Sequence, residues 1–484
     1  MRFYYPLLTV IILAACSIAD ESQGMEFSLK ANQKPIEVRT FMYCHYGSFD
    51  IAGTTELILK CDSSVQSCEI SPLYRAIKSR IKDNQISFKL DKPGYVMVRI
   101  NETEKFFVFA EEPEAIPNKN IINILNYGVD KSGQKTQTEL IRQAMDDAAV
   151  SGKTLLFPEG IYTTGQLRPK SNTHIHLARG ALLQSDVSSV SQYSSEDQVS
   201  TRKFIYIKDA ENVKITGYGT ISGNGTILRQ KFGDEARMRL VMAVNSRKLT
   251  IEGVMLQDPG SWNTQILLCE DVFIHRVKLM NNTGLSNTDG FDPDASKRLQ
   301  IVNCFALCGD DNVAIKTTNY GNYLGNVDDI VIRGNVFLTQ KSSLKVGTET
   351  RGELMRNILF EDNDVLESDR GMALYVSDGA KLEAIQFINN RFERNYPDAK
   401  QAGLYFQVNM RNADSKIGHI KNILIKDCVF YRSFPKLSQI AGLDRAHRIE
   451  NITIDNLVIE SEKVNSLQDA GIQANEFVKN LIFK

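Results

Sequence analysis

The chain has 484 residues, of which 42% are hydrophobic and 24% are charged, a composition typical of globular proteins. Its formal net charge of −1 gives no electrostatic reason to expect a nucleic-acid partner, because proteins that bind nucleic acids usually carry a basic excess. Beyond the first 16 residues, no apolar run is long enough to span a bilayer.

Residues 1–16 are expected to be a lipoprotein signal peptide and not part of the fold. A single Arg2 precedes the apolar run Phe3–Ala15, and Leu13-Ala-Ala-Cys16 resembles a bacterial lipobox, in which Cys16 is lipidated. The alternative is a secretion signal with an incidental cysteine. No Asp stands next to Cys16, which favours the outer membrane over the inner one. We therefore expect an exported bacterial lipoprotein in the outer membrane or periplasm, in contact with the membrane only through its lipid.

Residues 25–115 are expected to form a small N-terminal β-domain of the sandwich type. Apolar and polar residues alternate over 85–90 and 95–100, and 105–110 is a compact apolar strand. Pro113 and Pro117, beside several acidic residues, then indicate a linker.

One helix is expected after this linker, over residues 138–149. Thr136 or Thr138 is the candidate N-cap, and Gly152 is placed to end the helix. The apolar residues at helical spacing are Leu140, Ile141, Ala144, Ala148 and Val150.

From residue 120 to the end, the dominant signal is a repeated short strand, usually preceded by Asn or Asp. The interval varies from 23 to 38 residues, which favours a parallel β-helix over a propeller or a leucine-rich repeat. Ten matches in order also argue against a β-sandwich. The second residues of the ten repeats are Val213, Leu249, Val272, Leu299, Ile330, Ile358, Ile385, Ile423, Ile452 and Leu481.

Eight cysteines are present, and the seven that follow Cys16 are an odd number, which argues against a full disulfide framework. Cys61 and Cys68 are close enough in sequence to pair in an oxidising compartment, and the sequence leaves this open. There is no Cys-x-x-Cys pair and no histidine cluster, so we expect neither a structural zinc site nor any other metal or cofactor.

Two neighbouring repeats contain an unusual density of carboxylates. Asp289 lies in Asn-Thr-Asp-Gly, and Asp310 and Asp311 follow Gly309, which indicates a bend that brings both side chains outward. Asp311 comes 22 residues after Asp289, about one coil, so the two backbones should stack about 5 Å apart. Repulsion between the acids would raise one pKa and so supply a general acid beside a general base. An inverting glycosidase separates these by about 6.5–9.5 Å. Turn capping or calcium binding are the alternative roles.

These motifs resemble glycoside hydrolase family 28, the polygalacturonases, which is marked by Asn-Thr-Asp-Gly and then Gly-Asp-Asp. The resemblance implies an all-β chain with a right-handed parallel β-helix of the pectin-lyase type over residues 120–484. It also implies an inverting hydrolase in which Asp310 is the general acid and Asp289 and Asp311 hold and deprotonate the attacking water. Asn287 would help to position the site.

Two further family motifs are absent from this chain. Where the family has Gly-His-Gly this chain has Lys341-Ser-Ser, and where the family has Arg-Ile-Lys it has Met372-Ala-Leu-Tyr375. The pair that would bind a uronate carboxylate is therefore missing, which puts unsubstituted galacturonan in doubt. Lys345, Arg351 or Arg370 are candidate replacements, and Tyr375 is a candidate for the sugar-binding groove.

The N-terminal β-domain and the three aspartates also resemble the dextranase and isopullulanase family, glycoside hydrolase family 49. The sequence therefore predicts a monomeric, polygalacturonase-like hydrolase of a polysaccharide or oligosaccharide. Three alternatives stay open. They are a dextranase-like hydrolase of a neutral α-glucan, a polysaccharide lyase, and a non-catalytic glycan-binding surface lipoprotein.

Overall fold

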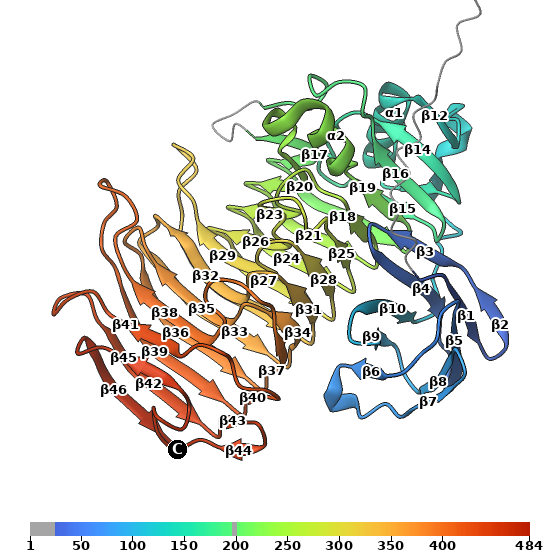
Figure 1. The fold of residues 1–484 in the computed structure, drawn as a ribbon. Coiled ribbons are helices and arrows are strands. Elements are labelled where there is room, and N and C mark those ends of the chain that lie inside the picture. Colours follow the sequence, from blue (N-terminus) through green and yellow to red (C-terminus); the bar gives the residue numbers. More distant parts are fainter. Residues whose placement is uncertain (1–24, 196–200) are drawn as a thin grey trace, which may run out of the picture.

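The computed structural model describes residues 25–195 and 201–484 (Figure 1). The expected signal peptide and the lipidation site Cys16 lie outside these residues. Within the described ranges, no helix is both long enough and apolar enough to cross a membrane.

The N-terminal domain consists of two five-stranded sheets. The first has the strand order β2 (Lys34–Ile36), β1 (Phe27–Ala31), β5 (Thr55–Cys61), β8 (Gln85–Leu90) and β7 (Ser79–Lys82). The second has the order β3 (Val38–Phe41), β4 (Cys44–Asp50), β10 (Glu104–Glu111), β9 (Gly94–Ile100) and β6 (Cys68–Ser71), with the short helix η1 (Leu73–Arg75) beside it. Cys61 and Cys68, left open by the sequence, are both free thiols.

From Ile121 onward the chain winds into a right-handed parallel β-helix, so the predicted fold class is confirmed. Figure 1 shows its strands stacked in chain order from teal to red. Three sheets run along it. Sheet 1 contains β11 (Ile121–Asn123), β13 (Thr154–Phe157), β15 (His174–Leu177), β18 (Glu211–Gly217), β21 (Arg247–Glu252), β24 (Glu270–His275), β27 (Lys297–Val302), β30 (Val327–Arg333), β33 (Leu354–Glu361), β36 (Lys381–Ile388), β39 (His419–Lys426), β42 (Ile449–Asp455) and β46 (Val478–Phe483).

Sheet 2 contains β12 (Ser132–Thr136), β14 (Gly160–Thr164), β16 (Ala181–Ser185), β19 (Thr220–Ser222), β22 (Met255–Gln257), β25 (Lys278–Met280), β28 (Phe305–Cys308), β31 (Val336–Thr339), β34 (Asp364–Ser368), β37 (Arg391–Asn395), β40 (Val429–Phe430), β43 (Val458–Ile459) and β44 (Glu462–Lys463). Sheet 3 contains β17 (Arg202–Lys208), β20 (Met238–Val244), β23 (Thr264–Leu267), β26 (Phe291–Asp294), β29 (Val313–Thr317), β32 (Ser342–Thr350), β35 (Arg370–Val376), β38 (Ala402–Val408), β41 (Ser438–Ala441) and β45 (Ile472–Ala474).

All ten predicted repeats are strands of sheet 1, and their second residues pair with one another from coil to coil, beginning with Val213 opposite Leu249 and ending with Ile452 opposite Leu481. These side chains are buried in the coil interior or packed against it. The first residue of every repeat has a positive φ, from 49° to 60°. Asn and Asp tolerate this left-handed conformation best, which explains why they recur there.

The predicted helix is α1 (Thr138–Ser151), ended by Gly152 in the left-handed conformation. Its buried face, formed by Ile141, Ala144, Met145 and Ala148, packs on the first coils, beside η2 (Ile124–Tyr127). The predicted N-caps are wrong: Gln137 is the cap residue, without a capping side chain, because the hydroxyl of Thr138 accepts a bond from the amide of Gly165. Thr136 donates instead to Asp186. Two residues assigned to the apolar face, Leu140 and Val150, are exposed.

The N-terminal domain packs on the outer face of sheet 2, and Figure 1 shows it, in blue, beside the middle of the β-helix. Glu367 of β34 binds both Arg99 and Lys105, and Lys278 of β25 binds Glu111. The apolar side chains in this interface are Phe41, Cys44, Tyr46, Tyr95, Met97, Phe107 and Phe109 from the N-terminal domain and Met255, Met280, Phe305, Leu307, Val336, Leu338 and Leu366 from the β-helix.

Candidate active site

The three predicted catalytic aspartates lie on two stacked loops that lead from sheet 2 into sheet 3. Asp289 comes just before β26, and Asp310 and Asp311 come before β29. The amide of Gly290 donates to the carbonyl of Asp311 at 2.8 Å, which holds the two coils in register. Glycine is required at 290 because a Cβ would lie 2.5 Å from the carbonyl oxygen of Asn312.

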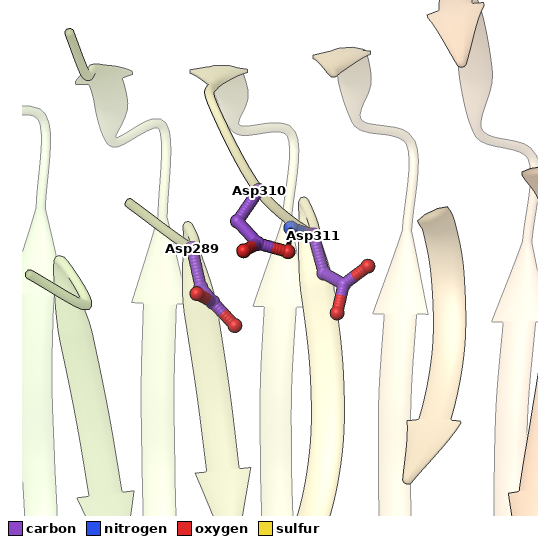
Figure 2. A group of neighbouring side chains, drawn as sticks. All are labelled: Asp289, Asp310 and Asp311. Carbon is purple, nitrogen blue, oxygen red and sulfur yellow. Dashed lines mark hydrogen bonds between the residues drawn. The ribbon is translucent and has the colours of Figure 1, made fainter. Parts of the chain in front are cut away.

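The three carboxylates form one cluster (Figure 2). One oxygen from each of Asp289, Asp310 and Asp311 lies within 4.8 Å of the others. Asp310 and Asp311 both reach the cluster because they lie in a loop, where neighbouring side chains need not alternate as they do in a strand. These closest oxygens lie nearer together than the roughly 6.5–9.5 Å expected between the carboxyl groups of an inverting enzyme, because the coils stack directly on one another.

Two buried lysines from sheet 3 balance the charge of this cluster. The Lys316 ammonium lies 3.1 Å from Asp289 and 2.7 Å from Asp292, whereas the Lys345 ammonium donates to Asp311 at 2.6 Å. The amide of Ser342 donates to the other oxygen of Asp311 at 2.9 Å. Asp311 is therefore held on both oxygens, whereas Oδ1 of Asp289 is buried without a hydrogen bond to any described residue.

The pKa values of the three acids are shifted in different directions. Burial raises the pKa of Asp310 to about 7, and the negative charges of Asp311 and Asp289 add to this effect. Burial also raises the pKa of Asp289, helped by Asp311 and opposed by the Lys316 ammonium. Burial acts in the same direction on Asp311, but Lys345 and then Arg370 outweigh it, and the pKa of Asp311 is lowered. One acid that holds its proton thus lies beside one that stays ionised, as general acid–base catalysis requires.

The predicted substrate-binding residues lie around this cluster in different roles. Asn287 is on the loop of Asp289, where its side-chain oxygen accepts a bond from Arg237. Lys345 binds Asp311 itself, so its charge is already used inside the protein. Tyr375 packs on Tyr405, with ring centroids 5.4 Å apart. Arg370 is close enough to Asp311 to lower its pKa.

Arg370 and Arg351 differ as replacements for the missing uronate-binding pair. The nearest carboxylate to Arg370 is that of Asp369, at 3.4 Å, and Nε of Arg370 is buried without a hydrogen bond to any residue in the described ranges. Arg351 instead binds Asp414 at 2.9 Å and lies 3.4 Å from Asp378. Arg351 is therefore engaged in two ion pairs away from the three clustered aspartates.

Sequence reasoning missed Lys316, which contacts two aspartates and a tryptophan at this site. Trp262 is the only tryptophan of the chain, and its ring centroid lies 3.4 Å from the Lys316 ammonium and 3.8 Å from the Arg239 guanidinium carbon. Such contacts are cation–π interactions. The alternation of side chains along the strand could have identified Lys316. Val313 and Ile315 face the core, so Lys316 points outward, beside the aspartates. From the sequence, Trp262 is a candidate both for stacking on a sugar and for core packing.

The fold resembles those of solved structures. It superposes on the hyperthermoactive exopolygalacturonase from Thermotoga maritima with a TM-score of 0.61 at 21% identity, covering 77% of this chain and 93% of that one. The TM-score with Dex49A from Penicillium minioluteum is 0.59 at 12% identity, covering 91% of this chain and 83% of that one. At these identities the likeness shows the fold alone.

Sequence comparison finds relatives among the polygalacturonases. The chain is 25% identical over 276 residues to a probable polygalacturonase of Vitis vinifera, which is 52% of this chain and 56% of that protein. It is 30% identical over 322 residues to an exo-poly-alpha-D-galacturonosidase of Dickeya chrysanthemi, which is 53% of this chain and 52% of that protein. The chain spans about half to two thirds of the length of the curated relatives that it matches.

The sequence profile of glycosyl hydrolases family 28 matches residues 150–461, which include all three clustered aspartates. The matched segment covers more than half of the chain. It begins within α1 and extends past β42, so it contains nearly the whole β-helix. The chain therefore belongs to glycosyl hydrolases family 28.

Proposed function

We propose that this protein is a glycoside hydrolase that cleaves a pectin-type, uronate-containing polysaccharide with inversion at the anomeric carbon. The observation that supports this most strongly is the aspartate cluster, in which the pKa of Asp310 is raised to about 7 while that of Asp311 is lowered. Family membership and polygalacturonase relatives support the choice of substrate class.

In the proposed reaction, Asp310 donates its proton to the glycosidic oxygen as the bond between that oxygen and the anomeric carbon breaks. A water held by Asp289 and Asp311 attacks the anomeric carbon from the opposite face. Its proton passes to Asp289, the stronger base of the two because its pKa is raised, while Asp311 orients the water.

Inversion is supported by the ion pairs of Asp289 and Asp311, the two acids that would hold the water. Asp289 and Asp311 each have an oxygen engaged by a buried lysine, which lowers the nucleophilicity of both carboxylates. The close spacing of the oxygens resembles that of retaining enzymes instead, so the product anomer is the decisive observation. Proton NMR during early turnover should show the inverted anomer, and a retained anomer would contradict the mechanism.

The uronate assignment is supported by Arg370. This guanidinium is mostly buried, lies near the catalytic aspartates, and has an Nε without a hydrogen bond to any described residue. A substrate carboxylate would bind the exposed part of this side chain, 13% of its surface, since Arg binds carboxylates in a bidentate manner.

The experiment that tests the function is a panel of pectic polymers, dextran and pullulan assayed for reducing ends. Asp310→Asn should lower the rate about 10²- to 10⁴-fold. The matched control is Asp271→Asn, because Asp271 lies on sheet 1 and pairs with Arg298 at the surface. Cleavage of dextran but not of pectic polymers would overturn the uronate assignment. An activity that EDTA abolishes and that yields an ultraviolet-absorbing unsaturated product would identify a lyase, and no cleavage at all would leave only a glycan-binding role.

A further inference from the structure

The N-terminal domain reaches the loops of the candidate active site through a single turn. Met42 and Tyr43 form the two-residue turn between β3 and β4, and the Tyr43 hydroxyl is hydrogen-bonded to the hydroxyl of Thr283. Thr283 begins the loop that carries Asn287 and Asp289. This is a contact between residues 240 positions apart in the chain.

Thr283 also touches the loop of the general acid. A Cβ built on Gly309 would lie 2.8 Å from the Cα of Thr283 and 3.0 Å from its carbonyl oxygen. Gly309 immediately precedes Asp310. The Tyr43 hydroxyl is therefore bonded to a residue that packs directly against the backbone leading into Asp310.

The composition of the turn is unusual for its position. Two-residue hairpin turns favour Asn-Gly or Asp-Gly, because their backbone needs positive φ. Here Met42 takes the positive φ, at 53°, and a large aromatic residue follows it. Both side chains are open to solvent, with Met42 42% and Tyr43 57% exposed. Folding of the domain does not explain two large apolar side chains there, because neither belongs to either of its cores.

We propose that Tyr43 is a substrate-binding residue, whose ring stacks on a sugar unit beside the bond that is cleaved. The proposal rests on the polysaccharide hydrolase function proposed above. Tyrosine suits this role because it offers an apolar face at low entropic cost while its hydroxyl is fixed by a partner, here Thr283. Burial of the hydroxyl end raises the pKa of Tyr43 to about 12, so this anchor stays neutral over the working pH range.

With Tyr43 in this role, the N-terminal domain takes part in substrate recognition. Extensive packing on sheet 2 holds this domain in place, including the Glu367 pairs with Arg99 and Lys105. The turn is thus presented by a rigid scaffold at a fixed position next to the aspartate loops.

The test measures kcat and KM of the full chain on the polymer that the panel identifies, for Tyr43→Ala, Tyr43→Phe and Phe273→Ala. Phe273 is the matched control, being an exposed aromatic residue on β24 of sheet 1. Tyr43→Ala should raise KM about 5- to 10-fold with kcat changed less than twofold, while Tyr43→Phe, which keeps the ring, stays within twofold of the parent in both. Phe273→Ala should match the parent.

Binding without turnover gives a second measurement. In the Asp310→Asn background, quenching of the single Trp262 by added oligosaccharide reports affinity, and Tyr43→Ala should weaken it by the same factor as KM. An unchanged KM and affinity in Tyr43→Ala would overturn the proposal. So would a kcat loss of more than twofold that is equal in Tyr43→Phe and Tyr43→Ala, since the hydroxyl would then only support the Thr283 loop. A parent that cleaves no polymer would instead defeat the proposed function.

Discussion

Two stacks of buried polar side chains run along this β-helix, and they differ in how completely they are hydrogen-bonded. In the asparagine stack, the side-chain amide of Asn335 donates to Asn363 and that of Asn363 donates to Asn390, each at 2.8 Å. All three residues are fully buried, and their side-chain oxygens also accept backbone amides. This stack satisfies its own polar groups.

The aspartate cluster does the opposite. Like charges are brought together on neighbouring coils, and Asp289 Oδ1 and Ser342 Oγ are buried without a hydrogen bond to any residue of 25–195 or 201–484. Repeating folds place identical polar groups at one coil spacing in both cases. Incomplete pairing, and not burial or stacking, therefore distinguishes the aspartate cluster from the asparagine stack.

The largest expected effect on stability comes from breaking the asparagine stack. Asn363→Ala leaves the backbone amide of Asn335 without an acceptor and its side chain with only the carbonyl of Ile301. It also removes a donor from Asn390, and together these losses should cost about 2–5 kcal/mol of unfolding free energy. Thermal melting followed by circular dichroism measures this, with the exposed Asn118→Ala as the control. Equal melting temperatures for the two variants would mean that the stack does not stabilise the fold.

At high pH, a substitution in the aspartate cluster should raise the stability of the protein, whereas Asn363→Ala lowers it. Because the pKa of Asp310 is raised to about 7, its contribution to stability is full below the unfolded pKa near 4 and is lost as pH rises through 7. An amide resembles the protonated acid, so Asp310→Asn should stabilise the protein by about 2–4 kcal/mol at pH 8.5. At about pH 3, below the unfolded pKa, the two proteins should melt together. A variant that is less stable than the parent at pH 8.5 would contradict this.

Two buried serines provide the smallest and most closely matched test. Ser296 donates to the carbonyls of Ile266 and Asp294 and accepts the amide of Cys269, so Ser296→Ala should cost about 1–3 kcal/mol. The Ser342 hydroxyl has no such bonds, and Ser342→Ala keeps the backbone amide that holds Asp311, so its cost should stay below about 0.5 kcal/mol. Chemical denaturation of both variants compares these values directly. Similar losses would mean that the hydrogen bonds of a buried hydroxyl do not decide its contribution to stability.

Much of the fold was predictable from sequence because its signal repeats. Ten short strands were placed in order, and their second residues, such as Val213 and Leu249, proved to be partners across coils. The N-caps of α1 failed because Thr138 forms a tertiary bond with Gly165, which no local pattern reveals. The lipidation of Cys16 stays a prediction.

The candidate site was predictable to a different depth. Asp289, Asp310 and Asp311 were found from their density and one-coil spacing, and the structure brings them together. Their charge balance was not foreseen, because Lys345 was assigned to the substrate and instead binds Asp311. A role for Tyr43 could not be predicted from the sequence, since its position depends on how one domain packs on another.

The measurement that tests the account most directly is the pH dependence of kcat/KM on the cleaved polymer between pH 4 and 9. With Asp310 as the proton donor, activity should fall on the alkaline side with a midpoint near pH 7. Lys345→Met should move that midpoint upward, because the Lys345 ammonium lowers the pKa of Asp310. A rate that stays level up to pH 9, or a midpoint that does not respond to the loss of Lys345, would contradict the assignment of Asp310 as the acid.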